Sequence, residues 1–191
     1  LAIANLVTDH ALPTDIGRDH GHVLDLLLAS GKIVTGFATD NKSGPFRRLK
    51  KLFEIDARIT VYLADGLDSL PIDVNTIIIT CMGGLLINQI ISHGTQYLKN
   101  ITSIIVGPHQ QVYEVRQYLS RIGFTIAEET IVEEDNQFYD LMRFERGCAL
   151  YSEEELKWGP LNLKTKSPEL LSKMAKRIEE KRNYAGQVKV T

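Results

Sequence analysis

Residues 75–84 read Asn-Thr-Ile-Ile-Ile-Thr-Cys-Met-Gly-Gly, and the first half of this stretch is almost uniformly apolar. A strand with apolar side chains on both faces must be covered on both faces, which is typical of central strands in a parallel sheet. A helical pattern follows directly, with apolar residues at Leu85, Leu86, Ile90 and Ile91. The stretch therefore predicts a buried strand followed by a helix, which is one unit of an α/β fold.

The same alternation of short apolar runs and helical patterns extends outward from this stretch in both directions. It is typical of βαβ units and of a mostly parallel sheet. Two further extended runs, joined by Glu133-Glu-Asp-Asn136, indicate a β-hairpin. The expected strands are 12–16, 33–38, 59–63, 75–80, 101–106, 124–132 and 137–145, and the expected helices are 22–30, 43–53, one from about 84, 111–121 and 168–183.

Five βα units followed by a hairpin match the Rossmann-like methyltransferase fold, whereas a dinucleotide dehydrogenase usually has a sixth parallel strand. We predict an α/β protein with a mostly parallel seven-stranded sheet, a C-terminal antiparallel hairpin and a short helical tail. Residues 1–147 are expected to form the cofactor-binding domain. Residues 148–191 are expected to form a loop, running through Trp158-Gly-Pro160, and a basic helical tail.

The composition indicates a soluble protein with one sizeable core. Of the 191 residues, 43% are apolar. The most apolar stretch, 76–87, is interrupted by Thr80 and Gly83-Gly84, so it is too short to cross a membrane. The two cysteines, Cys81 and Cys148, lie in apolar or strand-like runs and are predicted to be buried, reduced thiols. This pattern favours the cytoplasm.

The net charge of -2 hides an asymmetry along the chain. Residues 157–191 contain nine Lys or Arg against three Glu, whereas residues 1–156 contain thirteen Lys or Arg against twenty-one Asp or Glu. A basic tail favours binding to a polyanion such as RNA. The alternative is that these cations only solvate an exposed helix face, and the same alternative applies to the basic run around Arg47.

The turn after the first predicted strand reads Asp15-Ile-Gly17-Arg-Asp19-His-Gly21-His22. Its glycines permit a tight turn and a close backbone approach to a ligand. Asp19 stands where a G-x-G-x-x-G site needs its second glycine. The two carboxylates would repel a pyrophosphate but attract a cation, and S-adenosylmethionine carries an ammonium and a sulfonium. The turn therefore favours S-adenosylmethionine over NAD, unless it is an ordinary turn with solvated aspartates.

Three further strand ends carry residues that suit the same cofactor. Asp40 follows the second strand, where a carboxylate accepts two hydrogen bonds from a ribose diol. Asp65 and Gly66 follow the third strand, where the carboxylate is placed to accept from the adenine amino group. Met82 and Gly83 follow the fourth, where paired glycines leave room for a flat ring or a substrate base. Each motif alone is as typical of a plain turn as of a binding site.

Several motifs occur in order along the chain: Asp15-Ile-Gly-Arg-Asp-His20, Gly44-Pro-Phe46, Asp65-Gly-Leu67, Met82-Gly-Gly84, Glu133-Glu-Asp135 with Phe138-Tyr139, and Gly159-Pro160. Through these motifs the chain resembles the bacterial tRNA (adenine-22-N1)-methyltransferase family over residues 3–163. The family belongs to the Rossmann-like S-adenosylmethionine-dependent methyltransferases.

The resemblance implies N1-methylation of adenine 22, in the D-loop region of tRNA, with S-adenosylmethionine as cofactor. It implies that residues 15–21 form the cofactor turn, that Asp40 binds ribose and that Asp65-Gly66 meets adenine. It also implies a catalytic role for Asp19, whose carboxylate would steady the charge that develops on adenine and accept an amino proton. Asp19 is equally suited to capping the helix that follows.

The chain departs from the family at three places. Gly107-Pro108-His109 stands where the family usually has Gln-Pro-Asn, Thr39-Asp40 replaces a Gly-Glu pair, and the helical region at the end is shorter. We expect the substrate to contact Gly83, His109, Arg47, Lys176 and Arg177. Either Phe138 or Tyr139 should face the core, since neighbours in a strand point to opposite faces. The alternative is that one of these rings stacks on a flipped base.

The predicted enzyme acts on tRNA as a monomer or weak dimer, without a metal, because no Cys or His spacing is typical of a zinc site. Three alternatives remain at this point. One is a nucleic-acid-binding relic of the same fold that no longer turns over. Another is a small-molecule methyltransferase, which would not need the basic tail. An NAD oxidoreductase is disfavoured by the acidic turn.

Overall fold

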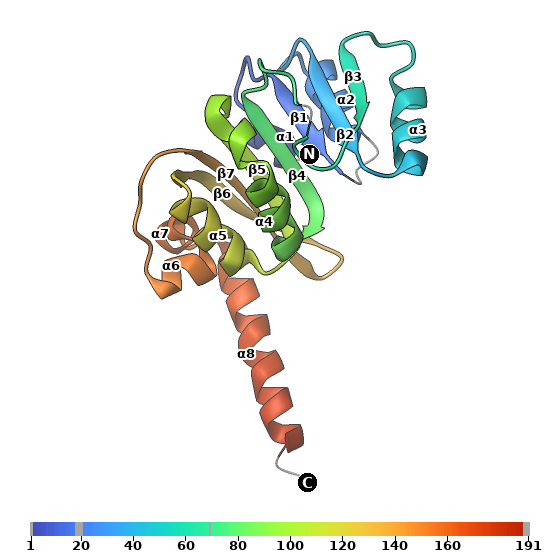
Figure 1. Ribbon diagram of the computed structural model, residues 1–191. Helices are drawn as coiled ribbons and strands as arrows, with labels where there is room; N and C mark the ends of the chain where they lie inside the picture. The colour runs from blue at the N-terminus through green and yellow to red at the C-terminus, as the bar shows by residue number, and fades with distance from the viewer. Residues whose placement is uncertain (1, 18–20, 69, 189–191) are drawn as a thin grey trace.

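The structure is a computed structural model that describes residues 2–17, 21–68 and 70–188, with side chains up to Asn183. The elements lie in two helical layers around one sheet, and the last helix projects away from it (Figure 1). In chain order they are α1 (Ala2–Leu6), β1 (Pro13–Ile16), α2 (His22–Ala29), β2 (Gly36–Asp40), α3 (Ser43–Leu52), β3 (Ile59–Leu63), β4 (Thr76–Gly83), α4 (Gly84–His93), the 3-10 helix η1 (Thr95–Asn100), β5 (Ser103–Gln110), α5 (Val112–Arg121), β6 (Phe124–Glu134), β7 (Gln137–Arg146), α6 (Glu153–Trp158), α7 (Pro160–Thr165) and α8 (Pro168–Val188).

The strands form a seven-stranded sheet in the order β3-β2-β1-β4-β5-β7-β6. β1 to β5 are parallel, and β7 inserts antiparallel between β5 and β6. The chain runs from β1 outward to β3, then returns to the other side of β1 with β4, so the strand order reverses between β1 and β4. This topology confirms the predicted fold class.

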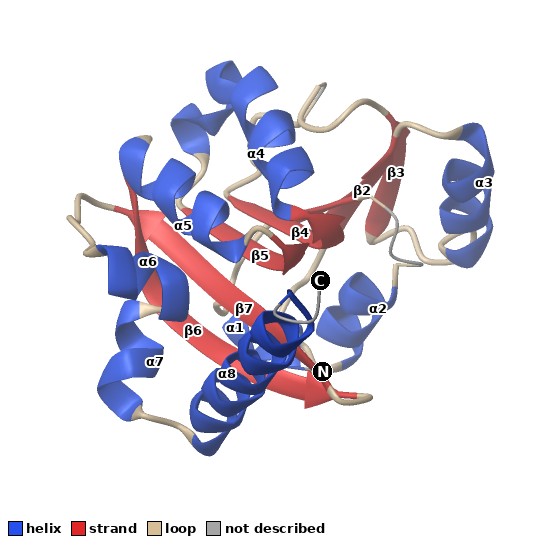
Figure 2. Cartoon of the chain, turned by 90° about the horizontal axis from the view of Figure 1, so that it is seen from below, coloured by secondary structure: helices blue, strands red, loops and turns tan. Residues whose placement is uncertain are grey.

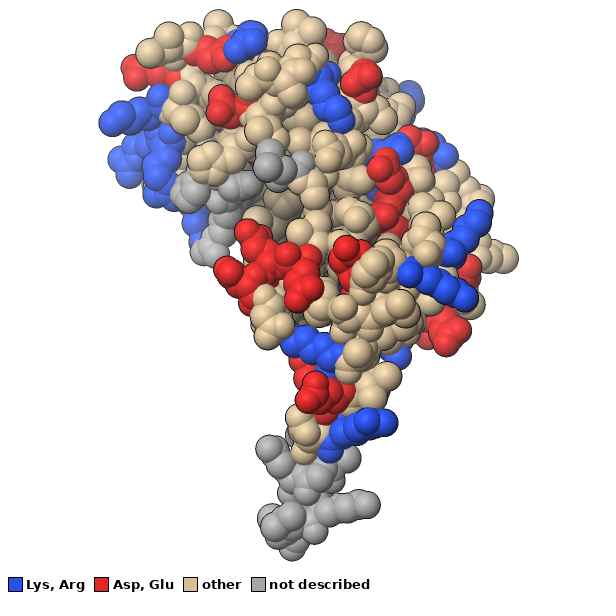
Figure 3. Space-filling view, turned by 180° about the vertical axis from the view of Figure 1, so that it is seen from behind, with Lys and Arg blue, Asp and Glu red and all other residues tan. Residues whose placement is uncertain are grey.

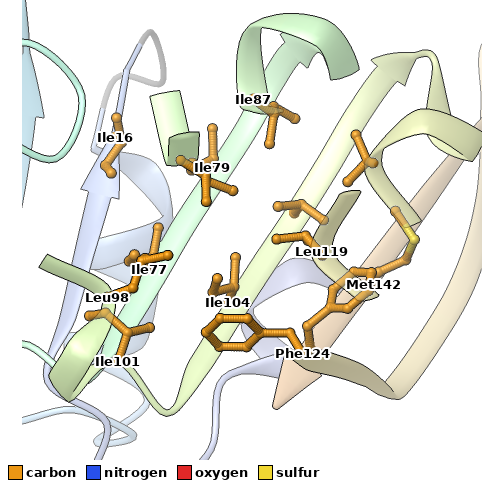
Figure 4. Packing of buried hydrophobic residues seen from close by; sticks show 14 of the residues in the cluster. Ile16, Ile77, Ile79, Ile87, Leu98, Ile101, Ile104, Leu119, Phe124 and Met142 are labelled. Atoms are coloured by element: carbon orange, nitrogen blue, oxygen red, sulfur yellow. The ribbon is translucent and has the colours of Figure 1, made fainter. Parts of the chain in front are cut away.

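The two faces of the sheet bury separate apolar clusters because successive side chains of a strand point to opposite faces. Ile77 and Ile79 of β4 belong to the cluster beneath α4 and α5, which Figure 4 shows from close by. Ile78, between them, belongs to the cluster that includes residues of α1, α2 and α3. The two helical layers are seen on opposite sides of the sheet in Figure 2. The uniformly apolar run of residues 77–79 is thus explained by a strand buried on both faces.

The prediction of a continuous loop after residue 147 was wrong, because α6 and α7 occupy much of that stretch. α6 begins with a capping box: the Ser152 hydroxyl accepts from the Glu155 backbone N–H, and the Glu155 carboxylate accepts from the Ser152 N–H. The Ser-x-x-Glu spacing could have indicated this helix start. α6 packs against α5, and α7 packs against β6.

Other boundaries also differ from the predictions. β2 begins at Gly36 because Ile33 closes the turn after α2, where its N–H donates to Leu27 O. The short helix α1 and the 3-10 helix η1 were not predicted. Cys81 and Cys148 are exposed rather than buried, so that prediction was wrong. Both cysteines lie where regular pairing of a strand breaks down or ends.

Candidate functional site

The carboxyl ends of the parallel strands meet at a cavity of about 400 Å³, which we call the cofactor cavity. It lies where the strand order reverses, the usual ligand position in open α/β sheets. Five residues predicted to bind the cofactor line it, and they come from four different strand ends: Gly17, Asp40, Asp65, Gly66 and Met82. The other lining residues are Ile16, Thr39, Asn41, Lys42, Ala64, Cys81, Gly83, Leu86 and Ile90.

Of the two remaining residues of the predicted cofactor set, the structure describes only Asp15. Asp15 is a buried residue of β1, where it pairs with Ala38 and Ile78, so it lies inside the sheet behind the cavity wall. Asp19, the predicted catalytic residue, lies outside the described residues, as does the whole stretch 18–20. The roles inferred for both aspartates stay predictions.

Gly17 brings the first turn against the end of β4. Its φ of +94° lies in the region that side chains disfavour, and its N–H donates to Thr39 O at 2.9 Å. A Cβ added there would lie 1.8 Å from Met82 Cε. Two predicted residues from distant parts of the sequence, Gly17 and Met82, therefore meet because glycine leaves room for the thioether.

Asp40 and Asp65 place two carboxylates in the cofactor cavity. Asp40 is buried, and its Oδ1 accepts from the Lys42 N–H at 2.8 Å, which leaves the second oxygen for a ligand. Asp65 is exposed, and its Oδ1 accepts from Asn41 Nδ2 at 3.0 Å. Carboxylates accept hydrogen bonds and repel phosphate, so this pair suits a ribose diol and an amino group or a cation. Together with apolar Leu86 and Ile90, they fit a nucleoside with a positive charge.

The two glycines of Met82-Gly83-Gly84 have different environments. Gly83 lines the cofactor cavity. A Cβ on Gly84 would lie 2.5 Å from Gln111 O, so this glycine lets the start of α4 pack against the start of α5. Gly83 was predicted to contact the substrate, and the structure places it beside the cofactor residues instead of in the neighbouring cavity described next.

A second cavity of about 520 Å³ lies beside the first, and we call it the substrate cavity. The two share one lining residue, Cys81, which lies at a bulge in β4 and has a φ of +58°. The other lining residues are Ala2, Ile3, His22, Val23, Leu26, Thr80, Gly107, His109, Val132, Glu134, Tyr139 and Leu141. The bulge turns the end of β4 into a partition with one cavity on each side.

The hairpin forms the outer wall of the substrate cavity. The rings of His109 and Tyr139 meet edge to face, with centroids 5.5 Å apart and planes at 69°. His109, a predicted substrate residue, is thus at the cavity with an aromatic partner. Sequence reasoning raised stacking of Phe138 or Tyr139 on a base only as an alternative, and it did not predict Glu134 or His22 in this wall. Period-two alternation in the hairpin separates Tyr139 from Phe138, but it does not tell which of them faces the cavity.

The predicted tRNA-binding cations lie on two separate helices. Arg47 is exposed on α3, where its Nε donates to Ser43 O of its own helix at 3.2 Å. Lys176 of α8 donates to Asn136 O at the hairpin turn and lies 5.8 Å from the centroid of the Phe138 ring. Arg177 is exposed on the same helix. On the face in Figure 3, acidic side chains gather between the basic ones over α3 and those along α8.

A buried ionic cluster, which sequence reasoning did not predict, joins α8 to the sheet. The Nη2 of fully buried Arg116 lies 3.0 Å from both Glu129 and Asp140, and Lys173 of α8 pairs with Asp140. Glu129 Oε1 also accepts from the Leu161 N–H at 2.7 Å. We call Arg116, Glu129, Asp140 and Lys173 the Arg116 cluster. It connects α5, β6, β7 and α8 and contacts the start of α7.

Comparison with known proteins identifies the family. A model of the tRNA (adenine(22)-N(1))-methyltransferase family matches residues 13–190. The chain belongs to this family. The Bacillus subtilis tRNA (adenine(22)-N(1))-methyltransferase is 26% identical over 196 residues, which cover 97% of this chain and 82% of the relative. The predicted family, and with it the methyltransferase class, are confirmed.

Solved structures of the family agree with this fold. Streptococcus pneumoniae Sp1610 superposes with a TM-score of 0.93 and 31% identity, covering 97% of this chain and 86% of that one. The complex of Sp1610 with S-adenosyl-L-methionine gives a TM-score of 0.89 at the same identity, over 94% of this chain and 86% of Sp1610. In the described part of this chain, no helix is long and apolar enough to span a membrane. Nor do its described residues group three or more His, Cys, Asp or Glu side chains as a metal site would.

Proposed function

We propose that this family member methylates N1 of adenine 22 in tRNA, with S-adenosylmethionine as the methyl donor bound in the cofactor cavity. The observation that supports this most strongly is the convergence of Gly17, Asp40, Asp65 and Met82 from four strand ends on one cavity at the strand-order reversal. Sp1610, which has the same fold, was crystallised with S-adenosyl-L-methionine.

Different residues of the cofactor cavity are proposed to bind different parts of S-adenosylmethionine. The second carboxylate oxygen of Asp40 accepts from the ribose hydroxyls, and Asp65 accepts from the adenine amino group. Gly17 and Met82 close the cavity toward β1 and hold the amino-acid end of the cofactor against the first turn. The negative charge of Asp15 and Asp19 near that turn favours a cationic ligand.

The reaction takes place where the two cavities meet, at Cys81. S-adenosylmethionine supplies a methyl group that its sulfonium already activates. Positioning the adenine N1 lone pair in line with that methyl group therefore accounts for most of the rate enhancement. The substrate cavity positions the base and excludes water from it. Asp19 is proposed to stabilise the positive charge that methylation places on the adenine and to accept a proton from its amino group.

The basic helices extend the binding surface for tRNA beyond the cavities. The exposed cations Arg47 on α3 and Arg177 on α8 are proposed to contact tRNA phosphates, and Lys176 supports the hairpin through its hydrogen bond to Asn136 O. The protein acts as a monomer or weak dimer in the cytoplasm, where its tRNA substrate is found.

Calorimetric titration with S-adenosylmethionine tests the cofactor site. The intact chain should bind with a micromolar dissociation constant, and Asp40→Ala should weaken binding about 10- to 100-fold, since a charged hydrogen-bond acceptor is lost. Asp73→Ala is the matched control, because Asp73 is an exposed acid at the opposite end of β4. An intact chain that does not bind the cofactor would contradict the proposal.

Methyl transfer to a tRNA transcript tests the substrate. The intact chain should methylate a transcript with adenine at position 22 and not one with guanine there, and nuclease digestion should give 1-methyladenosine as the product. Methylation of a different base or position would overturn the proposed position while leaving the cofactor assignment in place.

A further inference from the structure

The tip of the β6–β7 hairpin carries a motif that the proposed function leaves unused. Pairing in the hairpin sets Val132 opposite Tyr139 and Glu133 opposite Phe138. Because side chains alternate along each strand, Glu134 and Tyr139 share one face with Val132, whereas Glu133 and Phe138 share the other. The first face lines the substrate cavity, and Phe138 on the second lies by Lys176 of α8.

The tip of the hairpin continues past the point where β7 stops pairing with β5. β7 runs antiparallel to β5, and their last paired residues toward the carboxyl end of β5 are Val106 and Met142. Residues of β7 before Met142 therefore extend past the end of that pairing. There Tyr139 meets His109, which lies just beyond the part of β5 that pairs with β7. The hairpin tip thus stands over the cavity that begins at Cys81.

The lining of the substrate cavity suits a flat base with an amino group. Most of the wall is apolar or aromatic, with Ile3, Val23 and Leu26 on one side and the Tyr139 ring on the other. Glu134 is the one carboxylate among the described residues that line it. A carboxylate accepts a hydrogen bond from the exocyclic amino group of adenine, whereas guanine would present a carbonyl oxygen at that place and be repelled.

We propose that Glu134 and Tyr139 select the target base: Tyr139 stacks on the extruded adenine, and Glu134 accepts from its exocyclic amino group. This rests on the proposed function and adds its base specificity. Methylation at N1 leaves a positive charge that the adenine ring shares with the amino group, so the Glu134 carboxylate also stabilises the product more than the substrate. Lys176 of α8, by contacting Asn136 O, holds the hairpin tip in this position.

A cycle that combines a variant with a base analogue tests the Glu134 contact. The transcript carries adenine or unsubstituted purine at position 22, and Glu134→Ala is compared with the intact chain. The analogue alone and Glu134→Ala alone should each lower kcat/KM about 10- to 100-fold. Because both remove the same hydrogen bond, their combination should cost little more than either alone.

The control is Glu133→Ala, which removes the same charge one residue away on the opposite face of the hairpin. It should keep kcat/KM within about 3-fold of the intact chain and keep the full sensitivity to the purine analogue. Losses that multiply in the Glu134→Ala combination, or a Glu133→Ala loss as large as that of Glu134→Ala, would overturn the role of Glu134.

Stacking is tested separately at Tyr139. Tyr139→Ala should raise KM for tRNA about 10-fold or more, since stacking of a base on an aromatic ring is lost. Tyr139→Phe keeps the ring and should restore KM to within about 3-fold. Equal losses in both variants would overturn the stacking role.

Cofactor titration separates the failure of this inference from that of the proposed function. All four variants, at positions 133, 134 and 139, should bind S-adenosylmethionine as the intact chain does, because these residues lie outside the cofactor cavity. If the intact chain methylates adenine 22 but the variants behave like the control, only the base-selection role fails. If the intact chain does not methylate adenine 22, the proposed function fails, and base selection fails with it.

Discussion

The cofactor cavity and the Arg116 cluster are built in opposite ways. The cavity is lined by the ends of successive strands and the short turns that follow them. Its key residues are small or acidic: Gly17, Asp40 and Asp65. The Arg116 cluster consists of charged side chains from the interiors of α5, β6 and β7 and from α8. The two partners of each of its ion pairs are separated by 13 to 33 residues in the sequence. One region is open to a ligand, and the other is closed around its own ion pairs.

The difference shows how binding and stability are separated in this chain. Strand-end turns contribute few buried contacts, so they can present carboxylates to a ligand. The Arg116 cluster is buried, and each of its charges depends on the others for compensation. Changes in the cavity should therefore alter ligand affinity, and changes in the cluster should alter the free energy of unfolding.

The largest effect is expected for Arg116→Met. Removing this guanidinium leaves Glu129 and Asp140 buried without their shared cation, which should lower the free energy of unfolding by about 3–5 kcal/mol. Urea unfolding followed by circular dichroism measures the change. Arg58→Met, which breaks the exposed pair with Asp56, is the control and should leave the midpoint nearly unchanged. An equally stable Arg116→Met protein would remove the distinction between the two regions.

Gly17→Ala should have a smaller effect on stability and a clear effect on the cofactor. A φ of +94° costs a residue with a Cβ about 1–2 kcal/mol, and the added Cβ displaces the Met82 thioether into the cofactor cavity. S-adenosylmethionine affinity should fall about 10-fold, by calorimetry. In a Met82→Ala background the contact is absent but the backbone strain remains, so Gly17→Ala should there lower stability as before and lower affinity much less than it does in the intact chain. Unchanged affinity in Gly17→Ala would argue that Met82 does not shape the cavity.

Ser152→Ala removes the cap of α6 and should cost about 1 kcal/mol of unfolding free energy at neutral pH. Hydrogen bonds from the Ser152 N–H and hydroxyl lower the pKa of Glu155 below its usual value of 4.5. A carboxyl group with a lowered pKa stabilises the fold above its unfolded value, and this contribution is lost as the pH falls through the folded value. The difference between the variant and the intact chain should therefore shrink below about pH 4.5 in urea titrations. A difference independent of pH would show that the hydrogen bond from the Ser152 hydroxyl to the Glu155 carboxylate contributes nothing, since the bond from the Ser152 N–H is kept in the variant.

The smallest expected effect concerns one tail cation. Arg177→Ala should weaken tRNA binding only a few-fold and reduce the slope of log affinity against log salt by about 1, because one phosphate contact is lost. Fluorescence anisotropy at several salt concentrations measures both quantities. Arg121→Ala, at the exposed end of α5, is a control of equal charge. Equal slopes for the two variants would mean that α8 does not follow the phosphate backbone.

Prediction from sequence worked best where the signal was local. The strand 59–63 was predicted with its observed bounds, and the turns that follow β1, β2 and β3 were recognised from their glycines and aspartates. It failed at α6 and α7, where Ser152-Glu-Glu-Glu155 was not recognised as a helix start. It also predicted that Cys81 is buried, whereas Cys81 is exposed at a bulge of β4, and a bulge that follows an apolar run leaves no periodic signal.

The sequence by itself determined the α/β class, the seven strands with their terminal hairpin, and the family, because hydrophobic periodicity and turn chemistry act over a few neighbouring residues. Tertiary structure alone decided which face of the hairpin meets the substrate cavity, how Gly17 meets Met82, and how Arg116 is compensated. Those outcomes depend on strand register and helix packing. A shift of one residue in a strand exchanges its faces, and contacts between distant residues leave no periodic signal along the chain.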